Sequence, residues 1–219
     1  MQELLTKVLP LAVGAAISPM IVTVVVLILS TPTRPRLRAW AFTLGATLTL
    51  IAVSLVGAQV FHTMHQHVGR DPTGAAVKGV AALLLLVLAW RAWRAKPTAG
   101  AAAMQRLDGA STAGFIGIGA LAMLANFSTL VLFIPAVREI VDDQSAAPEK
   151  LSVFAIALVV AMLPAWLPAA LATILGPRAD PLLSRVNMAV TRHSNQINMA
   201  ICLIFALYLG YGAAQDLLG

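Results

Sequence analysis

Six apolar stretches, each long enough to cross a lipid bilayer, constrain the fold of this chain more than any other feature. They cover approximately residues 4–29, 39–61, 74–93, 111–137, 150–175 and 195–217. A transmembrane helix needs roughly 20 apolar residues, whereas the strands of a barrel are about 10 residues of alternating polarity. Charged residues make up 11% of the sequence, well below the roughly 25% of soluble domains. We therefore expect an all-α membrane protein with six transmembrane helices, forming a single transmembrane domain over residues 1–219.

The charges in the links between these stretches predict the orientation of the chain. The odd-numbered links carry Arg34, Arg36, Arg38, Arg91, Arg94, Lys96, Arg106, Arg178, Arg185 and Arg192. The fourth link is acidic instead, with Glu139, Asp142, Asp143 and Glu149. Because positive charge resists translocation, the odd links are expected to be cytoplasmic and both termini external. The net charge of +6 is explained by these topology signals, and the absence of a basic stripe interleaved with aromatic residues excludes nucleic acid as a partner.

The chain divides into two sets of three stretches, about 1–95 and about 111–219, joined by a polar linker at about 96–110. The segments "AAISPMIVTVVVLIL", from Ala15, and "MLANFSTLVLFIPAV", from Met123, align so that Ser18 is paired with Asn126. Three crossings reverse the direction of the chain, so a repeat of this kind is inverted. Inverted repeats with interrupted helices are typical of transporters whose substrate site lies near the midplane of the membrane.

The pair Ser18-Pro19 interrupts the first apolar stretch near its centre. Proline has no N–H and clashes with the preceding turn, so we expect a kink and an unpaired carbonyl near Ala15. An orphan carbonyl in hydrocarbon costs several kcal/mol, and the amide of Asn126 has no place in lipid either. These polar atoms are expected to meet each other or a hydrated slot, although a plain packing kink is the alternative interpretation. The residues predicted to line a substrate groove here are Ser18, Pro19, Thr23, Asn126, Ser128 and Thr129.

A second interruption, "MLPAWLPAA", lies in the fifth stretch. Pro164 and Pro168 are four residues apart and so share one face of a helix. Two backbone hydrogen bonds are expected to be lost there, which predicts either a gate or a span that curves around its neighbours. In the fourth stretch, Gly114, Gly117 and Gly119 are expected to permit close approach of another helix.

The segment "LPLAVGAAISPMIVTVVVLILSTPTRPRLRAWAFTLGATLTL" resembles the peptidoglycolipid- and sulfolipid-addressing family, a branch of the lysine-exporter superfamily of six-span proteins. The end of the chain, "RHSNQINMAICLIFALYLGYGA", is similar to the last span of that family. Lysine exporters proper carry Gly-Pro after the first-span pair and proline after the fourth-span asparagine. This chain has neither, which weakens an inference of amino-acid export. The resemblance implies transport of a glycolipid or lipid-linked precursor across the inner membrane towards the envelope.

A lipid substrate agrees with the distribution of charge, because the only Asp or Glu inside a predicted span is Asp216, at the end of the last one, and proton relays usually need a carboxylate deeper in the membrane. A lipid tail stays in the bilayer while the head group crosses a polar groove. Cytoplasmic arginines are candidates to gather a phosphate head group, although orientation of the chain explains them equally well. These arginines are Arg34, Arg36, Arg38, Arg91 and Arg94, and Asn195 is a candidate for the inner mouth of the groove.

Two other functions remain open. The first is a small-solute exporter for amino acids or metal cations, for which the external His62, His65 and His67 offer a helical ligand spacing. The second is a non-transporting scaffold of a lipid-export complex. An enzyme is not expected, because no nucleophile, base and acid occur at a common depth, and no cofactor is expected. The expected partners are a membrane lipid or glycolipid, a second copy of the chain, and the envelope-lipid export machinery.

Overall fold

The computed structural model describes residues 2–65 and 110–179, together with isolated positions near 83–87 and between 181 and 207. Within these residues every regular element is a helix and no strand occurs, so the all-α prediction is confirmed for the described part of the chain. The predicted stretches 74–93 and 195–217 lie almost wholly outside the described residues, as do Arg91, Asn195 and His67.

The first apolar stretch forms two helices, α1 (Gln2–Ala16) and α2 (Pro19–Leu29), whose axes meet at an angle of 51°. Ser18 caps α2 in an extended conformation, and Pro19 occupies the first turn. Proline is well placed there because the first amides of a helix have no partner within the helix. The predicted kink at Ser18-Pro19 is confirmed.

The second stretch is a single long helix, α3 (Pro35–His65). A tight turn precedes it, with Arg34 in the left-handed region at φ 45°. Its residues Pro35–Gln59 have a mean hydropathy of 1.9. Because the hydrophobicity is nearly uniform around this helix, it suits a position surrounded by lipid and by other helices.

Two further bent pairs follow in the second half of the described chain. The fourth stretch forms α6 (Gly114–Ala125) and α7 (Phe127–Asp142), which meet at 76° around Asn126 without any proline at the break. The fifth forms α8 (Ala147–Ala161) and α9 (Leu163–Leu175), which meet at 67°, and a short helix η1 (Gly176–Ala179) ends the segment.

The fifth stretch corrects the prediction for its two prolines. The break lies at Met162, and Pro164 falls in the first turn of α9, where no helical bond is lost. Only Pro168 lies in the interior of a helix. At the break, the indole N–H of Trp166 donates to the carbonyl of Val159 at 3.1 Å, which satisfies one of the carbonyls left free at the end of α8.

Judged by length and composition, the apolar part of α3 suffices to span a membrane by itself, and each bent pair suffices as a pair. The described residues therefore contain one candidate span, or as many as four. The outer surface agrees with a hydrocarbon environment, since Leu44, Leu121 and Ile174 are 51%, 68% and 80% exposed. The interior is rich in alanine, which lets the helices approach closely.

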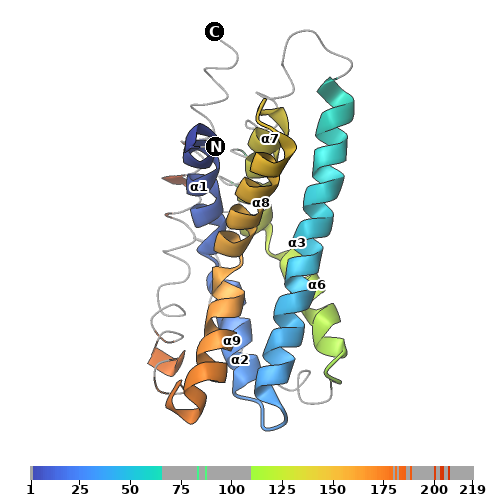
Figure 1. The fold of residues 1–219 in the computed structure, drawn as a ribbon. Helices are drawn as coiled ribbons and strands as arrows, with labels where there is room; N and C mark the ends of the chain where they lie inside the picture. Colours follow the sequence, from blue (N-terminus) through green and yellow to red (C-terminus); the bar gives the residue numbers. More distant parts are fainter. Residues whose placement is uncertain are drawn as a thin grey trace.

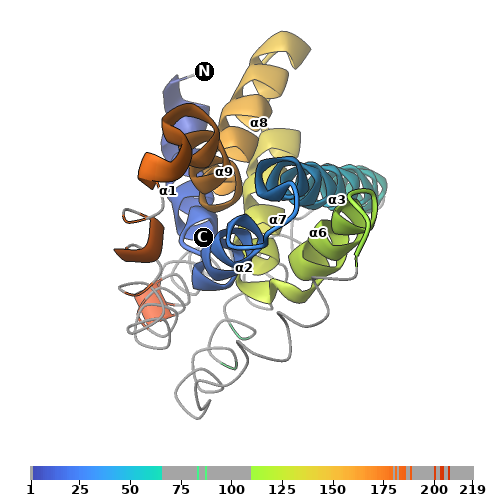
Figure 2. The same ribbon diagram turned by 90° about the horizontal axis from the view of Figure 1, so that it is seen from below.

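The helices pack so that each broken pair contacts an element from the other half of the chain. Helix α3 runs along α6 and α7, α1 along α7 and α8, and α2 along α9 (Figure 1). Viewed from below, α3 and α6 form one flank of the bundle (Figure 2). The turn before α3, the start of α6 and η1 share one end of the bundle, which carries Arg34, Arg36 and Arg178. The opposite end holds the start of α1 and the acidic α7–α8 turn.

Helices α3 and α6 touch backbone to backbone at two glycines. A Cβ added to Gly45 would lie 2.0 Å from the carbonyl oxygen of Ile116, and one added to Gly119 would lie 2.1 Å from that of Phe42. Of the three glycines predicted to permit close approach, only Gly119 does so. Gly117 faces open space, and Gly114 makes ordinary contacts.

Candidate functional site

The two breaks at Ser18 and Asn126 are joined by hydrogen bonds between their side chains. The Nδ2 amide of Asn126 donates to the Oγ of Ser18 at 3.0 Å and to the Oγ1 of Thr129 at 2.7 Å. Its Oδ1 accepts from the hydroxyl of Ser128 at 3.0 Å. The expectation that these polar atoms meet each other is confirmed. We call Ser18, Asn126, Ser128 and Thr129 the break cluster.

Thr129 supplies the donor that Pro19 lacks. Its hydroxyl donates to the carbonyl of Ala15 at 2.9 Å, the carbonyl that would accept from residue 19 in an unbroken helix. The sequence predicts the free carbonyl but does not identify its partner. The cluster therefore satisfies a backbone group of α1 with a side chain of α7, which fixes the two broken spans to each other.

The side chains of the break cluster are buried and hydrogen-bonded to one another in this structure. Ser18, Asn126 and Thr129 are 3%, 4% and 2% exposed, and both donors of the Asn126 amide are occupied. A hydrogen bond between buried polar groups is worth little net but is costly to leave unmade. These hydrogen bonds thus form a polar latch between the two bent helix pairs. The latch has to open before these side chains can contact any other molecule.

Thr23 lies outside this network. Its hydroxyl donates to the carbonyl of Pro19 on its own helix at 2.9 Å. Arg34 and Arg36 also lie apart from the break cluster, because the 11 residues of α2 separate them from Ser18, roughly 16 Å at 1.5 Å per residue. The structure therefore assembles four of the six predicted groove residues, next to Pro19, and places Thr23 and the two arginines elsewhere. A role of any of them in substrate binding stays a prediction.

Arg38 differs from the other arginines at its end of the bundle because it is buried, with 8% of its surface exposed. Its Nη2 donates to the carbonyl of Ala110 at 3.2 Å, and its guanidinium lies 5.1 Å from the ring centroid of Phe115. Its Nη1 has no hydrogen-bond partner. The sequence marked Arg38 only as one of several cytoplasmic cations.

An apolar groove runs along the flank formed by α3 and α6. It has a volume of about 510 Å³ and opens to the side of the bundle. Its lining is formed by Gly45, Leu48, Thr49, Ala52, Val53, Val56, Ile116, Ala120 and Leu124. The small side chains at positions 52 and 120 leave the hollow just beyond the point where the two backbones touch.

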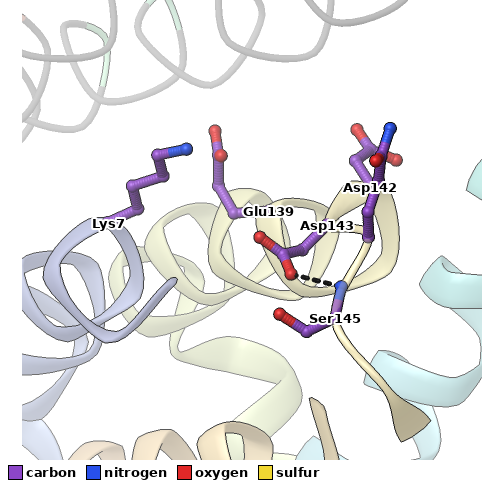
Figure 3. Close-up of a pocket in the computed structure, with 6 residues that line it drawn as sticks. Lys7, Glu139, Asp142, Asp143 and Ser145 are labelled. Carbon is purple, nitrogen blue, oxygen red and sulfur yellow. Dashed lines mark hydrogen bonds between the residues drawn. The ribbon is translucent and has the colours of Figure 1, made fainter. Parts of the chain in front are cut away.

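A second pocket, of about 560 Å³, lies at the acidic end of the bundle. Figure 3 shows Lys7 on α1 opposite Glu139 on α7, beside the turn that begins at Asp143. The carboxylate of Asp143 accepts from the amide of Ser145 at 2.7 Å. Hydrogen bonds from the hydroxyl and the amide of Ser145 lower the pKa of Asp143 below its ordinary value.

The histidine hypothesis is not tested. His62 and His65 belong to the last turns of α3, but the description of side chains ends before them, and His67 is outside the described residues. Among the side chains that the structure does describe, no group of three or more His, Cys, Asp and Glu is placed to hold a metal ion.

Comparison with known proteins relates the chain to a described family. A family model described as Sap, sulfolipid-1-addressing protein, matches residues 8–214. Neither the curated proteins nor the solved structures give a significant match.

Proposed function

Because the chain belongs to the sulfolipid-1-addressing protein family, we propose that it is an inner-membrane transporter that moves a lipid-linked or glycolipid substrate towards the cell envelope. The family links the protein to a lipid-related function at the membrane. The apolar outer surface and the bent spans agree with a protein that crosses the bilayer several times. The basic end of the bundle is the cytoplasmic end in this proposal, following the preference of positive charge for that side.

In this proposal the two halves of the chain are inverted repeats, and a transport cycle follows from that arrangement. The alignment of the two halves pairs Ser18 with Asn126, and both residues mark helix breaks, since α2 begins at Pro19 and α7 at Phe127. The packing follows the same pairing, because α8 runs along α1 as α3 runs along α6. Helix α9 likewise contacts α2 as α3 contacts α7. Transporters built in this way alternate access by moving one repeat against the other around a central site.

The observation that carries the proposal is the break cluster. It lies where two broken spans from different halves of the chain meet, and it consists of hydroxyl and amide groups without a carboxylate. Such groups suit the sugar hydroxyls of a glycolipid head group, which exchange hydrogen bonds readily. When the latch opens, the substrate head group takes over the bonds of Asn126 and passes between α2 and α7 while its tails remain in the bilayer.

The test is a head-group accessibility assay with purified protein in proteoliposomes. A fluorescent glycolipid is quenched from outside, and the rate at which protected lipid becomes accessible is measured. We expect the wild type to accelerate this rate and Asn126→Ala to lower it by about tenfold, which corresponds to roughly 1.4 kcal/mol. The physical reason is that the hydrogen bonds of the break cluster have to form again in each transport cycle, and the alanine variant lacks those of Asn126.

The control is Ser152→Ala, because the exposed Ser152 hydroxyl only donates to Pro148 on its own helix. It should transport as the wild type does. Wild-type protein that moves no glycolipid would contradict the transporter proposal and favour the scaffold. Equal rates for Asn126→Ala and the wild type would remove the break cluster from the mechanism.

A further inference from the structure

We propose that the flank formed by α3 and α6 binds one anionic membrane lipid, with its phosphate or sulfate head group at Arg38 and an acyl chain in the apolar groove. This proposal rests on the proposed function only for the placement of the bundle in a membrane. The site is separate from the break cluster, and its occupant is held on the outer wall of the protein rather than moved through it.

The first support is the electrostatic situation of Arg38. Its side chain is more than nine-tenths buried and its Nη1 has no partner. Among the described residues, no carboxylate lies within salt-bridge distance of Arg38. A buried charge is normally paired, because the loss of its hydration is otherwise uncompensated. The contact with the face of Phe115 offsets this loss only in part.

The position of Arg38 in α3 adds a second reason to expect an anion. Arg38 lies in the first turn of α3, which begins at Pro35. The amino-terminal end of a helix carries a partial positive charge and disfavours cations. A phosphate or sulfate group there is attracted by both the helix end and the guanidinium, whose planar donors match its oxygen atoms.

The groove lies where the tail of such a lipid would be. Arg38 precedes Gly45 by seven residues and so lies on nearly the same face of α3, roughly 10 Å along the axis. On α6, the ring under the guanidinium belongs to Phe115, the residue next to Ile116 of the groove. On this helix the lining of the groove begins at Ile116 and continues along Ala120 to Leu124. A single amphiphile can therefore span the basic end and the apolar hollow.

The lateral opening of the groove makes a membrane lipid the occupant. Side chains of its lining, such as Leu48 and Leu124, are largely exposed and apolar, and Arg34 at the basic end is exposed and cationic. This combination complements an anionic lipid of the cytoplasmic leaflet. Since Nη1 is closed to solvent, the head group enters from the side of Ala110, whose carbonyl accepts from Nη2, and its oxygen atoms then accept from both Nη1 and Nη2.

The test measures lipid binding to the full chain in nonionic detergent by native mass spectrometry. Phosphatidylglycerol is the anionic probe and phosphatidylcholine is the neutral one. We expect one phosphatidylglycerol to bind at least tenfold more tightly than phosphatidylcholine. Arg38→Gln should abolish this preference, whereas Arg178→Gln, an exposed cation at the same end, should keep it.

A second pair of variants tests the groove without touching the charge. Ala120→Phe fills the hollow and should weaken binding of phosphatidylglycerol by about tenfold, whereas the neighbouring Leu121→Phe, outside the groove, should not. Glycerol phosphate, the head group without chains, should compete weakly. Retained preference in Arg38→Gln, unchanged binding in Ala120→Phe, or full competition by glycerol phosphate would each overturn the proposal. Lipid binding and glycolipid translocation are separate readouts, so either proposal can fail while the other stands.

Discussion

Replacing Thr129 with valine tests whether a side-chain hydroxyl substitutes for the amide hydrogen that Pro19 lacks. Valine keeps the shape of the side chain but removes the donor to the carbonyl of Ala15, which lies 2.9 Å away. A buried carbonyl that loses its partner costs about 1–3 kcal/mol. For a chain of 219 residues, each kcal/mol lowers the melting temperature by roughly 2–4 °C. We therefore expect Thr129→Val to lower the melting temperature by about 4–8 °C, for a loss of about 2 kcal/mol.

The decisive measurement repeats this substitution in a Pro19→Ala background. Alanine restores an N–H four residues after Ala15 and allows the helix to close over the break. Thermal unfolding in detergent should then show that Thr129→Val loses less than half as much stability as it does with Pro19 present. The control is Thr47→Val, because the Thr47 hydroxyl donates only to the carbonyl of Thr43 on its own helix.

Equal losses in the two backgrounds would refute the reasoning. Thr129 also accepts a hydrogen bond from Asn126, and that part of the loss is common to both backgrounds. Only the part due to the carbonyl of Ala15 depends on Pro19, so the difference between the two backgrounds isolates it.

Two further predictions concern the packing of α3 and the acidic end. Gly45→Ala should destabilise the protein by about 1–3 kcal/mol or more, because the Cβ of the alanine would overlap the carbonyl of Ile116. Gly117→Ala, which meets open space, should be neutral or stabilise by up to about 1 kcal/mol, and the reverse order in thermal unfolding would contradict the observed packing. At the α7–α8 turn, the lowered pKa of Asp143 means that its bond to Ser145 contributes stability above the ordinary pKa of aspartate and loses it as the pH falls through the lowered value. The protection of the Ser145 amide, measured relative to its intrinsic exchange rate at each pH, should therefore be lost only under acidic conditions, and Asp143→Ala should lack this protection at every pH.

The sequence predicted the break at Pro19 because proline has a fixed effect on a helix. It predicted that the carbonyl near Ala15 would need a partner, but not which residue would provide it. That partner, Thr129, lies 114 positions away along the chain, and only the packing of α1 against α7 brings the two together. At Asn126 the sequence predicted a polar residue without a place in lipid, but not a helix break. The bend of 76° there was not predicted, because asparagine, unlike proline, permits a helix to continue.

The glycines and arginines also had structural roles that the sequence could not predict. Gly117 and Gly119 are two positions apart and look alike in the sequence, but a helix turns them to different sides, and only Gly119 meets α3. Gly45 carried no signal that distinguished it from other glycines. Arg36 and Arg38 are likewise two positions apart in a basic link, although one is exposed and the other buried. Composition identifies such residues as a group, and the neighbouring helices decide their individual roles.

The backbone contact between α3 and α6 has a mechanical consequence. With Gly45 and Gly119 in place, these helices have no side-chain layer in which to slide and should travel as one body. Helix α7 is held against α1 and also contacts α3, so the two units touch along α3 and α7 as well as being joined by the chain at Asn126. Opening of the break cluster should therefore bend the chain at Asn126 while α3 and α6 keep their contact.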